Sequence, residues 1–292
     1  MRVQKRVLVD GFYSCYRNLY AFKDIKTKDG RHSGVVFGFV RTLVTLAKRF
    51  PGAEIVVCWD RPSTWRKEVY PQYKSNRSGP RVDKDQLYSI ADFVRSVGLT
   101  QAMAPGHEAD DVIGSMIDRS KQNIIFSRDR DFCQLVEDGV VLVFSPRSGE
   151  VEEVIYNEAK VQERFGIPPR KLLHYRVLKG DTSDCLPGLP RFPSKKIIEL
   201  VETHDTIEEI TTAPRVELTD HQKKALTDFQ AQGLINLKLM KIQTDLEVQI
   251  VEGQYDRSRA EGILDRFELK SLRTHVNLFL EGEEEESLFA EE

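Results

Sequence analysis

Short apolar runs rich in β-branched residues alternate with longer stretches of helical periodicity in the first half of the chain. The runs at 6–10, 54–60 and 123–129 read as strands, and each ends in an aspartate. Between them, segments 35–49 and 86–97 repeat apolar residues at helical spacing. This alternation predicts an α/β fold in which a central, mostly parallel sheet is flanked by helices.

The pattern changes in the second half of the chain. Two further apolar runs, at 140–146 and 150–156, are typical of a hairpin that closes the sheet, with Ser148 and Gly149 in its turn. After residue 157 the pattern is mainly helical, in segments 158–165, 170–178, 194–201 and 220–241. We therefore expect an α/β core over 1–157, a helical region over 158–280 and a disordered acidic tail over 281–292.

Charge is distributed unevenly along the 292 residues. The net charge is −3, but seven acids lie in residues 281–292, and the remainder carries 43 basic and 39 acidic residues, a net of +4. Segment 61–81 holds six basic residues and one acid, interleaved with Trp65, Tyr70 and Tyr73. Cationic and aromatic side chains together suit a nucleic-acid backbone with stacked bases, although a solvated surface loop has the same composition.

Composition narrows the class of protein further. At 40% hydrophobic residues the chain can bury a real core, and no stretch has the length of a membrane span or the character of a signal peptide. We therefore expect a cytoplasmic protein. Four cysteines without CxxC spacing argue against a zinc site or a disulfide framework: Cys15, Cys58, Cys133 and Cys185.

Acidic residues recur where the predicted fold would bring them together. The carboxyl ends of parallel strands share one edge of a sheet, so Asp10, Asp60 and Asp129 would project into one crevice. Asp131 follows two residues after Asp129, which in an extended chain puts both side chains on the same side. Five more acids start a predicted helix or turn: Glu108, Asp110 and Asp111 in HEADD, and Asp181 and Asp184 in GDTSD. Taken singly, each of these motifs is also typical of a cap or a turn.

A cluster of nine carboxylates has an electrostatic cost. Two carboxylates about 5 Å apart repel by about 3 kcal/mol at an effective dielectric constant near 20. Several such pairs would exceed the stability of an ordinary domain, so cations must offset the repulsion. Oxygen ligands without His or Cys favour Mg²⁺ or Mn²⁺. Two such ions about 4 Å apart are suited to the in-line displacement of a phosphodiester.

In order and spacing, six motifs resemble the family of 5′ to 3′ exonucleases and flap endonucleases, which includes the nuclease domain of bacterial DNA polymerase I and free-standing phage enzymes. The resemblance runs from Val7 to Val201 and weakly beyond. It implies a resolvase-like or PIN-like core and a helical DNA-binding region, with segment 61–97 as a basic clamp or arch over the active site. The motifs are VDG at 9–11, CWD at 58–60, WRKEVYPQYKSNR at 65–77, HEADD at 107–111, SRDRDF at 127–132 and GDTSDCLPG at 180–188.

The resemblance also implies roles for individual residues. All nine acids occupy positions at which the family binds two Mg²⁺ or Mn²⁺ ions, and Lys74 and Arg77 match residues that contact the scissile phosphate. Tyr73 would stack on an unpaired base. The implied DNA contacts are Arg66, Lys67, Tyr73, Lys74, Arg77, Arg81, Lys195 and Lys196.

The implied activity is structure-dependent cleavage of DNA, or of RNA in a hybrid, at 5′ flaps, nicks and 5′-ended duplexes during replication or repair. The implied host is a bacterium or a phage-infected cell. A non-catalytic DNA-binding protein of the same fold is the alternative, although it would keep nine repelling acids without a use for them. A small-molecule phosphatase would leave the basic and aromatic stretch unexplained.

Two segments depart from the family pattern. In the family a helix-hairpin-helix turn of the form PGVxGIGxKTA grips duplex DNA, whereas this chain reads PGLPRFPSKKI at 187–197. Because Pro193 lacks an N–H, we expect a degenerate hairpin in which Lys195 and Lys196 still hold a phosphate. The acidic tail contains Leu288 and Phe289, which would suit docking on a sliding clamp, although a solubilising tail has the same composition.

Overall fold

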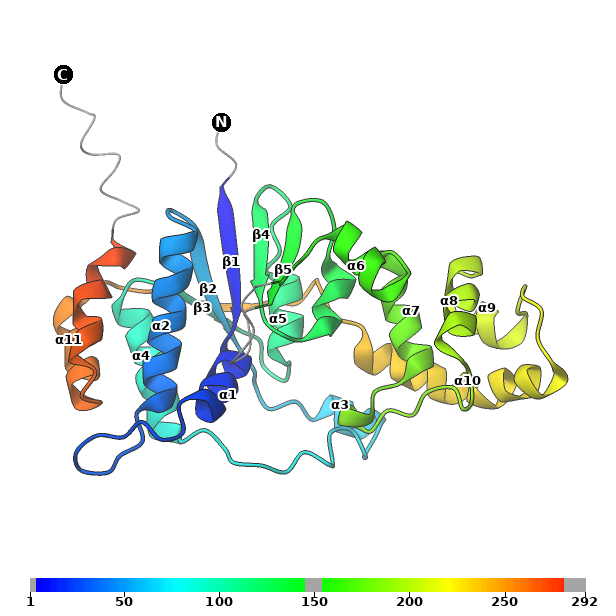
Figure 1. Ribbon diagram of the computed structural model, residues 1–292, viewed down its shortest axis with the longest axis horizontal. Coiled ribbons are helices and arrows are strands. Elements are labelled where there is room, and N and C mark those ends of the chain that lie inside the picture. Colours follow the sequence, from blue (N-terminus) through cyan, green and yellow to red (C-terminus); the bar gives the residue numbers. More distant parts are fainter. Residues whose placement is uncertain (1–3, 145–153, 281–292) are drawn as a thin grey trace, which may run out of the picture.

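The computed structural model describes residues 4–144 and 154–280, and its centre is a seven-stranded sheet with the order β6-β5-β4-β1-β2-β3-β7 (Figure 1). Strands β5, β4, β1, β2 and β3 run parallel, whereas β6 and β7 are antiparallel to their neighbours at the two edges. The strands are β1 (Lys5–Asp10), β2 (Glu54–Trp59), β3 (Thr100–Met103), β4 (Gln122–Phe126), β5 (Val140–Phe144), β6 (Val154–Tyr156) and β7 (Gln249–Val251).

The structure confirms the predicted α/β fold and its three main strands, β1, β2 and β4. Successive residues of β1 point to opposite faces, so that Val7 and Val9 join one apolar cluster and Leu8 joins the other. Both faces are therefore buried, which explains why these strands read as continuous apolar runs. The predicted strand pair at 140–156 is present as β5 and β6, but its turn lies outside the described residues.

Helices cover both faces of the sheet. Those that pack with Val7 and Val9 are α1 (Gly11–Ala21), α2 (Gly34–Arg49), α4 (Lys84–Ser96), α11 (Arg257–Arg266) and the 3-10 helix η3 (Lys270–Phe279). Those on the face of Leu8 are α5 (Ala109–Ser115), η1 (Arg130–Leu135), α6 (Glu158–Phe165) and α7 (Pro169–Lys179). The helix α1 starts directly after Asp10, at a position where the sequence pattern predicted no element.

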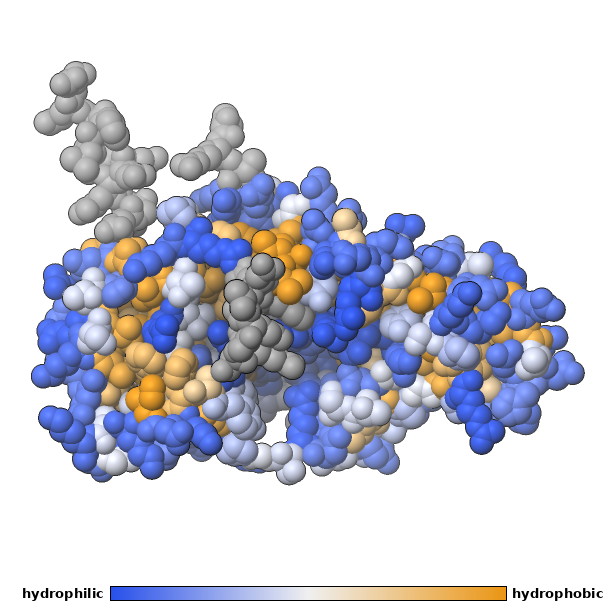
Figure 2. Space-filling view, viewed as in Figure 1, coloured by the Kyte–Doolittle hydropathy of each residue, from blue (hydrophilic) through white to orange (hydrophobic). Residues whose placement is uncertain are grey.

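Three helices extend the molecule to one side of the sheet, at the right of Figure 1 and of Figure 2: α8 (Ser194–Thr203), α9 (Ile207–Thr212) and α10 (Asp220–Met240). The helix α10 begins with a capping box in which Thr219 and Gln222 satisfy each other's backbone N–H groups. A short 3-10 helix, η2 (Thr182–Asp184), lies in the loop between α7 and α8. None of the helices within residues 4–144 and 154–280 is long and apolar enough to cross a membrane.

Two expected boundaries differ from the structure. Residues 249–279 do not belong to the helical region, because β7 pairs with the edge of β3 and α11 buries Ala260 and Leu264 in the core beside α4. Segment 61–97 also does not form one clamp, because α4 buries Ile90 and Phe93 in the same core. We keep the name clamp for residues 61–83, which contain a single short helix, α3 (Trp65–Val69).

The acidic tail lies outside the described residues, and so do Leu288 and Phe289, its proposed contacts to a sliding clamp.

Candidate active site

The strand order brings three of the predicted acids to one edge of the sheet. Because β1 lies between β4 and β2, Asp10, Asp60 and Asp129 all follow the carboxyl ends of adjacent strands. The chain moves outward from β1 through β2 to β3 and then crosses back to β4 on the other side of β1. Such a switch point in a parallel sheet is where ligand crevices form.

Asp10 is held rigidly at this edge. One carboxylate oxygen accepts from the Tyr13 N–H at 2.9 Å, which caps α1, and the other accepts from the Ser127 hydroxyl at 3.0 Å. Burial, reinforced by the nearby Asp60 carboxylate, raises the pKa of Asp10 to about 7. Ser127 is fully buried, and its oxygen also accepts from the Asp129 N–H, so it orients two acids at once. Sequence analysis did not identify this serine, although it stands in the SRDRDF motif.

The raised pKa of Asp10 predicts a gain in stability for Asp10→Asn in the absence of divalent ions. Between pH 4 and 7 folded Asp10 keeps a proton that the unfolded chain has released, so this contribution to stability falls as pH rises. Asparagine avoids this loss, so in chelator at pH 7.5 we expect the variant to melt roughly 5 °C above wild type. The advantage should shrink towards pH 4.

Thermal melts of both proteins at several pH values, with Asp245→Asn as an exposed control, would measure the effect. An Asp10→Asn melting temperature equal to or below that of wild type at pH 7.5 would show that burial of this charge costs nothing.

Asp129 and Asp131 are not arranged as expected from an extended chain. Strand β4 ends at Phe126, and Asp131 lies in the first turn of η1, which Asp129 caps by accepting the Asp131 N–H at 2.8 Å. The cap or turn that the sequence left open as an alternative is therefore present at Asp129. It still leaves both carboxylates at the pocket described below.

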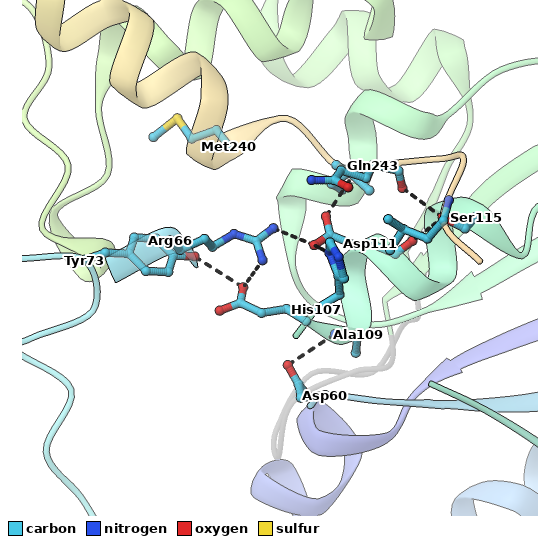
Figure 3. Close-up of polar contacts among 12 residues, drawn as sticks. Asp60, Arg66, Tyr73, His107, Ala109, Asp111, Ser115, Met240 and Gln243 are labelled. Atoms are coloured by element: carbon cyan, nitrogen blue, oxygen red, sulfur yellow. Dashed lines mark hydrogen bonds and ion pairs between the residues drawn. The ribbon is translucent and has the colours of Figure 1, made fainter. Parts of the chain in front are cut away.

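The helix α5 presents its three acids in different directions. Glu108 is the N-cap residue and Asp110 lies in the first turn, and both line the pocket. Asp111 is fully buried and does not line it. Asp60 accepts from the Ala109 N–H at 3.2 Å, which ties the end of β2 to the start of this helix (Figure 3).

Asp181 and Asp184 are presented by the tight loop around η2. Asp181 caps η2 by accepting from the Ser183 N–H and hydroxyl, and its backbone bridges to Leu186. The loop reverses at Cys185, whose φ of 61° is left-handed. Gly188 passes so close to Lys179 that a Cβ would lie 2.1 Å from the Lys179 carbonyl oxygen, so this crossing requires glycine.

These segments enclose one acidic pocket. Its acids come from α5, η1 and the η2 loop, and Asp10 and Asp60 lie close enough behind it to raise the pKa of Asp110. The structure thus brings eight of the nine predicted acids together and separates Asp111 from them. The acids that line the pocket are Glu108, Asp110, Asp129, Asp131, Asp181 and Asp184.

Crowding shifts the titration of the central acids. Burial together with Asp129 and Asp10 raises the pKa of Asp110 well above its ordinary value. Burial and Asp129 likewise raise the pKa of Asp131 to about 7, against the lowering effect of Arg176. Burial would also raise the pKa of Glu108, but Lys74 and Arg66 outweigh it and lower the value.

Basic side chains offset part of this negative charge. Lys74 Nζ lies 2.7 Å from Glu108 and 4.0 Å from Asp184, and Arg77 lies 2.5 Å from Asp184. With the acids paired in this way, no group of three His, Cys, Asp or Glu side chains within the described ranges is arranged as a ready-made metal site. The donor set nevertheless fits hard divalent cations, because the pocket is lined by carboxylate oxygens.

Arg176 of α7 is a member of the site that sequence analysis missed. Its guanidinium lies 2.7 Å from Asp131 and 2.6 Å from Asp181, so it bridges η1 and the η2 loop. The sequence did contain a signal for this role. Arg176 lies one helical turn before Gly180, so it belongs to the last turn of the helix that leads into the GDTSD loop and lies beside that loop.

The predicted DNA contacts have different surroundings. Lys67, Arg77, Arg81 and Lys195 are exposed, as a backbone contact requires, whereas Lys196 pairs with Glu199 at 2.6 Å. Arg66 and Tyr73 are only 3% and 5% exposed. The Tyr73 hydroxyl lies 3.3 Å from Glu108, so in this conformation its ring is not available for stacking on a base.

The family described as 5′-3′ exonuclease matches the chain in both of its parts, with the resolvase-like N-terminal domain at residues 5–166 and the C-terminal SAM fold at residues 167–262. The 5′-3′ exonuclease of Aquifex aeolicus is 29% identical over 293 residues, which cover 97% of this chain and 98% of that protein. DNA polymerase I of Chloroflexus aurantiacus is 31% identical over 90% of this chain, which corresponds to 29% of the polymerase.

A solved structure shares the fold. The bacteriophage T5 flap endonuclease, crystallised in a complex with DNA and metal ions, superimposes with a TM-score of 0.65 at 18% identity and covers 96% of this chain and 99% of its own.

Proposed function

This chain belongs to the 5′-3′ exonuclease and flap endonuclease family, and we propose that it is a metal-dependent nuclease that cleaves DNA at 5′ ends and 5′ flaps. The observation that carries the proposal is the convergence of acids from β1, β2, α5, η1 and the η2 loop beside Lys74 and Arg77. The T5 relative was crystallised with DNA and metal ions, which supports the same ligands for this chain. We extend the substrate class to RNA in RNA/DNA hybrids.

The acids of the pocket would hold two Mg²⁺ or Mn²⁺ ions, with Asp10, Asp60 and the six lining acids as ligands. When bound, such ions supply an activated water and neutralise charge on the transferring phosphate. The chain's own part is to place these carboxylates rigidly, through the caps at Asp10, Asp129 and Asp181 and the Ser127 hydroxyl.

Lys74 and Arg77 would bind the scissile phosphate. Both side chains reach the edge of the acidic pocket from the clamp, and each is paired with an acid of that pocket. A phosphate entering there would take over these charge-assisted hydrogen bonds, and the two cations would stabilise the charge that develops during cleavage. Lys67, Arg81 and Lys195 would contact the DNA backbone farther out.

A cleavage assay with and without Mg²⁺ tests the proposed function. With a labelled 5′-flap substrate we expect products carrying 5′ phosphates in Mg²⁺ and no cleavage in chelator. Blunt duplex, single-stranded DNA and a generic phosphate ester serve as comparison substrates. Tight flap binding without cleavage in Mg²⁺ or Mn²⁺ would instead favour the non-catalytic binding protein, and hydrolysis of the ester alone would favour a phosphatase.

A further inference from the structure

Asp111 is surrounded differently from every other acid of the cluster. It is completely buried, and one carboxylate oxygen accepts from Arg66 at 2.8 Å while the other accepts from the Gln243 N–H at 3.1 Å. The His107 ring lies 3.4 Å from the first oxygen. Both oxygens are therefore engaged by other groups of the protein, as Figure 3 shows for Arg66 and Gln243. Asp111 does not line the pocket, whereas the neighbouring Asp110 does.

Arg66 is equally enclosed. It belongs to α3, is 3% exposed, and its guanidinium also lies 3.7 Å from Glu108. A buried guanidinium costs several kcal/mol unless it is paired, so its carboxylate partners keep α3 against α5. Arg66 lines the acidic pocket, but a side chain that is 3% exposed and paired with Asp111 offers almost no surface to the backbone of DNA in this conformation.

The segment that follows α10, residues 241–246, also contacts α5 beside Asp111. Ser115, at the end of α5, accepts from the Leu246 N–H at 3.1 Å and donates within its own helix to the Asp111 backbone carbonyl at 2.8 Å. A Cβ at Gly114 would lie 2.5 Å from the Gln243 carbonyl oxygen, so α5 and this segment can approach closely only with glycine there. Asp111 thus sits where the clamp, α5 and the segment 241–246 meet, as Figure 3 shows.

The Asp111–Arg66 pair is linked to Lys74 through the backbone of the clamp and through Glu108. From Arg66 the chain turns through two backbone hydrogen bonds, Tyr70 N–H to the Arg66 carbonyl and Tyr73 N–H to the Tyr70 carbonyl, both 2.9 Å. Lys74 follows, its N–H donates to the Asp184 carbonyl at 3.1 Å, and its side chain shares Glu108 with Arg66. Arg66 and Lys74 are thus linked twice, through the backbone turn and through Glu108.

We propose that Asp111 and Arg66 form a buried ion pair that positions Lys74 over the acidic pocket, and that Asp111 is not a metal ligand and Arg66 is not a DNA contact. This inference rests on the proposed metal-dependent function. It replaces, for these two residues, the roles that the family resemblance implies.

Binding of Mn²⁺ to the full chain without DNA separates the two roles of the adjacent acids. By calorimetry or electron paramagnetic resonance we expect Asp110→Asn to weaken Mn²⁺ binding by about tenfold or more, and Asp111→Asn by less than about threefold. An equal loss in both variants would overturn the inference. If neither variant changes Mn²⁺ binding, the metal site of the proposed function is in the wrong place.

The effect on Lys74 is tested by single-turnover flap cleavage in Mg²⁺, well below the melting temperatures. We expect Arg66→Met to slow cleavage by about tenfold or more, Arg66→Lys to restore part of the rate, and the Arg66→Met/Lys74→Ala variant to be no slower than Lys74→Ala alone. A purely structural role would give multiplicative losses, and that outcome would overturn the positioning role.

Stability provides a readout that needs no substrate. Removing one partner leaves a buried charge unpaired, so Arg66→Met and Asp111→Asn should each lower the melting temperature by roughly 10 °C. The double variant should lose clearly less than the sum of the two. If a single variant does not fold, recovery of folding in the double variant would likewise show that the two side chains are paired. Additive losses in melting temperature would show that they are not.

Discussion

Asp131→Asn is expected to abolish flap cleavage while leaving DNA binding largely intact. Asp131 lines the pocket from η1, and Asp129 and Asp181 lie around it. The amide keeps the shape of the side chain but removes one negative charge from the site that would hold divalent ions. A loss of roughly a hundred- to thousandfold in single-turnover rate is the order expected when one electrostatic contact to the reacting centre is removed.

The control for this variant is Asp138→Asn, because Asp138 is exposed in the turn that follows η1 and does not line the pocket. Quenched-flow cleavage of a 5′-flap substrate in Mg²⁺ and a binding titration in chelator should be run on both proteins. Wild-type cleavage by Asp131→Asn would remove it from the proposed metal site. A parallel loss of DNA binding would mean that the substitution disturbs more than the ions.

Lys74→Ala should give the second large effect, a loss of roughly a hundredfold in turnover with little change in Mn²⁺ binding. The Lys74 ammonium lies among the acids of the pocket, since it contacts Glu108 and approaches Asp184. In the complex with DNA we expect it to move to the scissile phosphate. Removing it leaves the charge that develops on that phosphate less stabilised.

Lys67→Ala is the matched control for Lys74, because Lys67 belongs to the same clamp but is exposed and does not line the pocket. It should weaken DNA binding modestly and reduce its dependence on salt, with turnover at saturation preserved. A wild-type turnover in Lys74→Ala, or an equal loss in Lys67→Ala, would place the phosphate contact elsewhere on the clamp.

The basic residues around the acids have a second consequence. Lys74, Arg77 and Arg176 each lie within 3 Å of a carboxylate of the pocket, so they partly neutralise the cluster in the protein alone. Under the proposed function, divalent ions and DNA would replace some of these internal pairs. In the protein without ligands, these ion pairs reduce the repulsion among the carboxylates and so limit what the acidic pocket costs in stability.

Much of the site was accessible from the sequence because it depends on local pattern and on general properties of parallel sheets. The alternation of apolar runs and helical segments determined the α/β core, and the aspartate after each run determined that Asp10, Asp60 and Asp129 share one edge. The spacing within GDTSD likewise determined that Asp181 and Asp184 lie on one tight loop.

Other features depended on contacts between distant segments. The short strand β7 takes its place from the free edge of β3, and α11 from the apolar face of α4, so neither had a strong local signal. Arg176 enters the site because α7 ends at the η2 loop, and Ser127 because β4 lies beside β1.

The two aspartates of HEADD show the division most clearly. Local pattern determined that Asp110 and Asp111 lie in the first turn of a helix, but not which partner each would meet. The tertiary structure decided that one faces the pocket and the other faces Arg66 and Gln243. The physical reason is that adjacent helical residues point about 100° apart, so their surroundings are set by whatever the rest of the chain packs on each side.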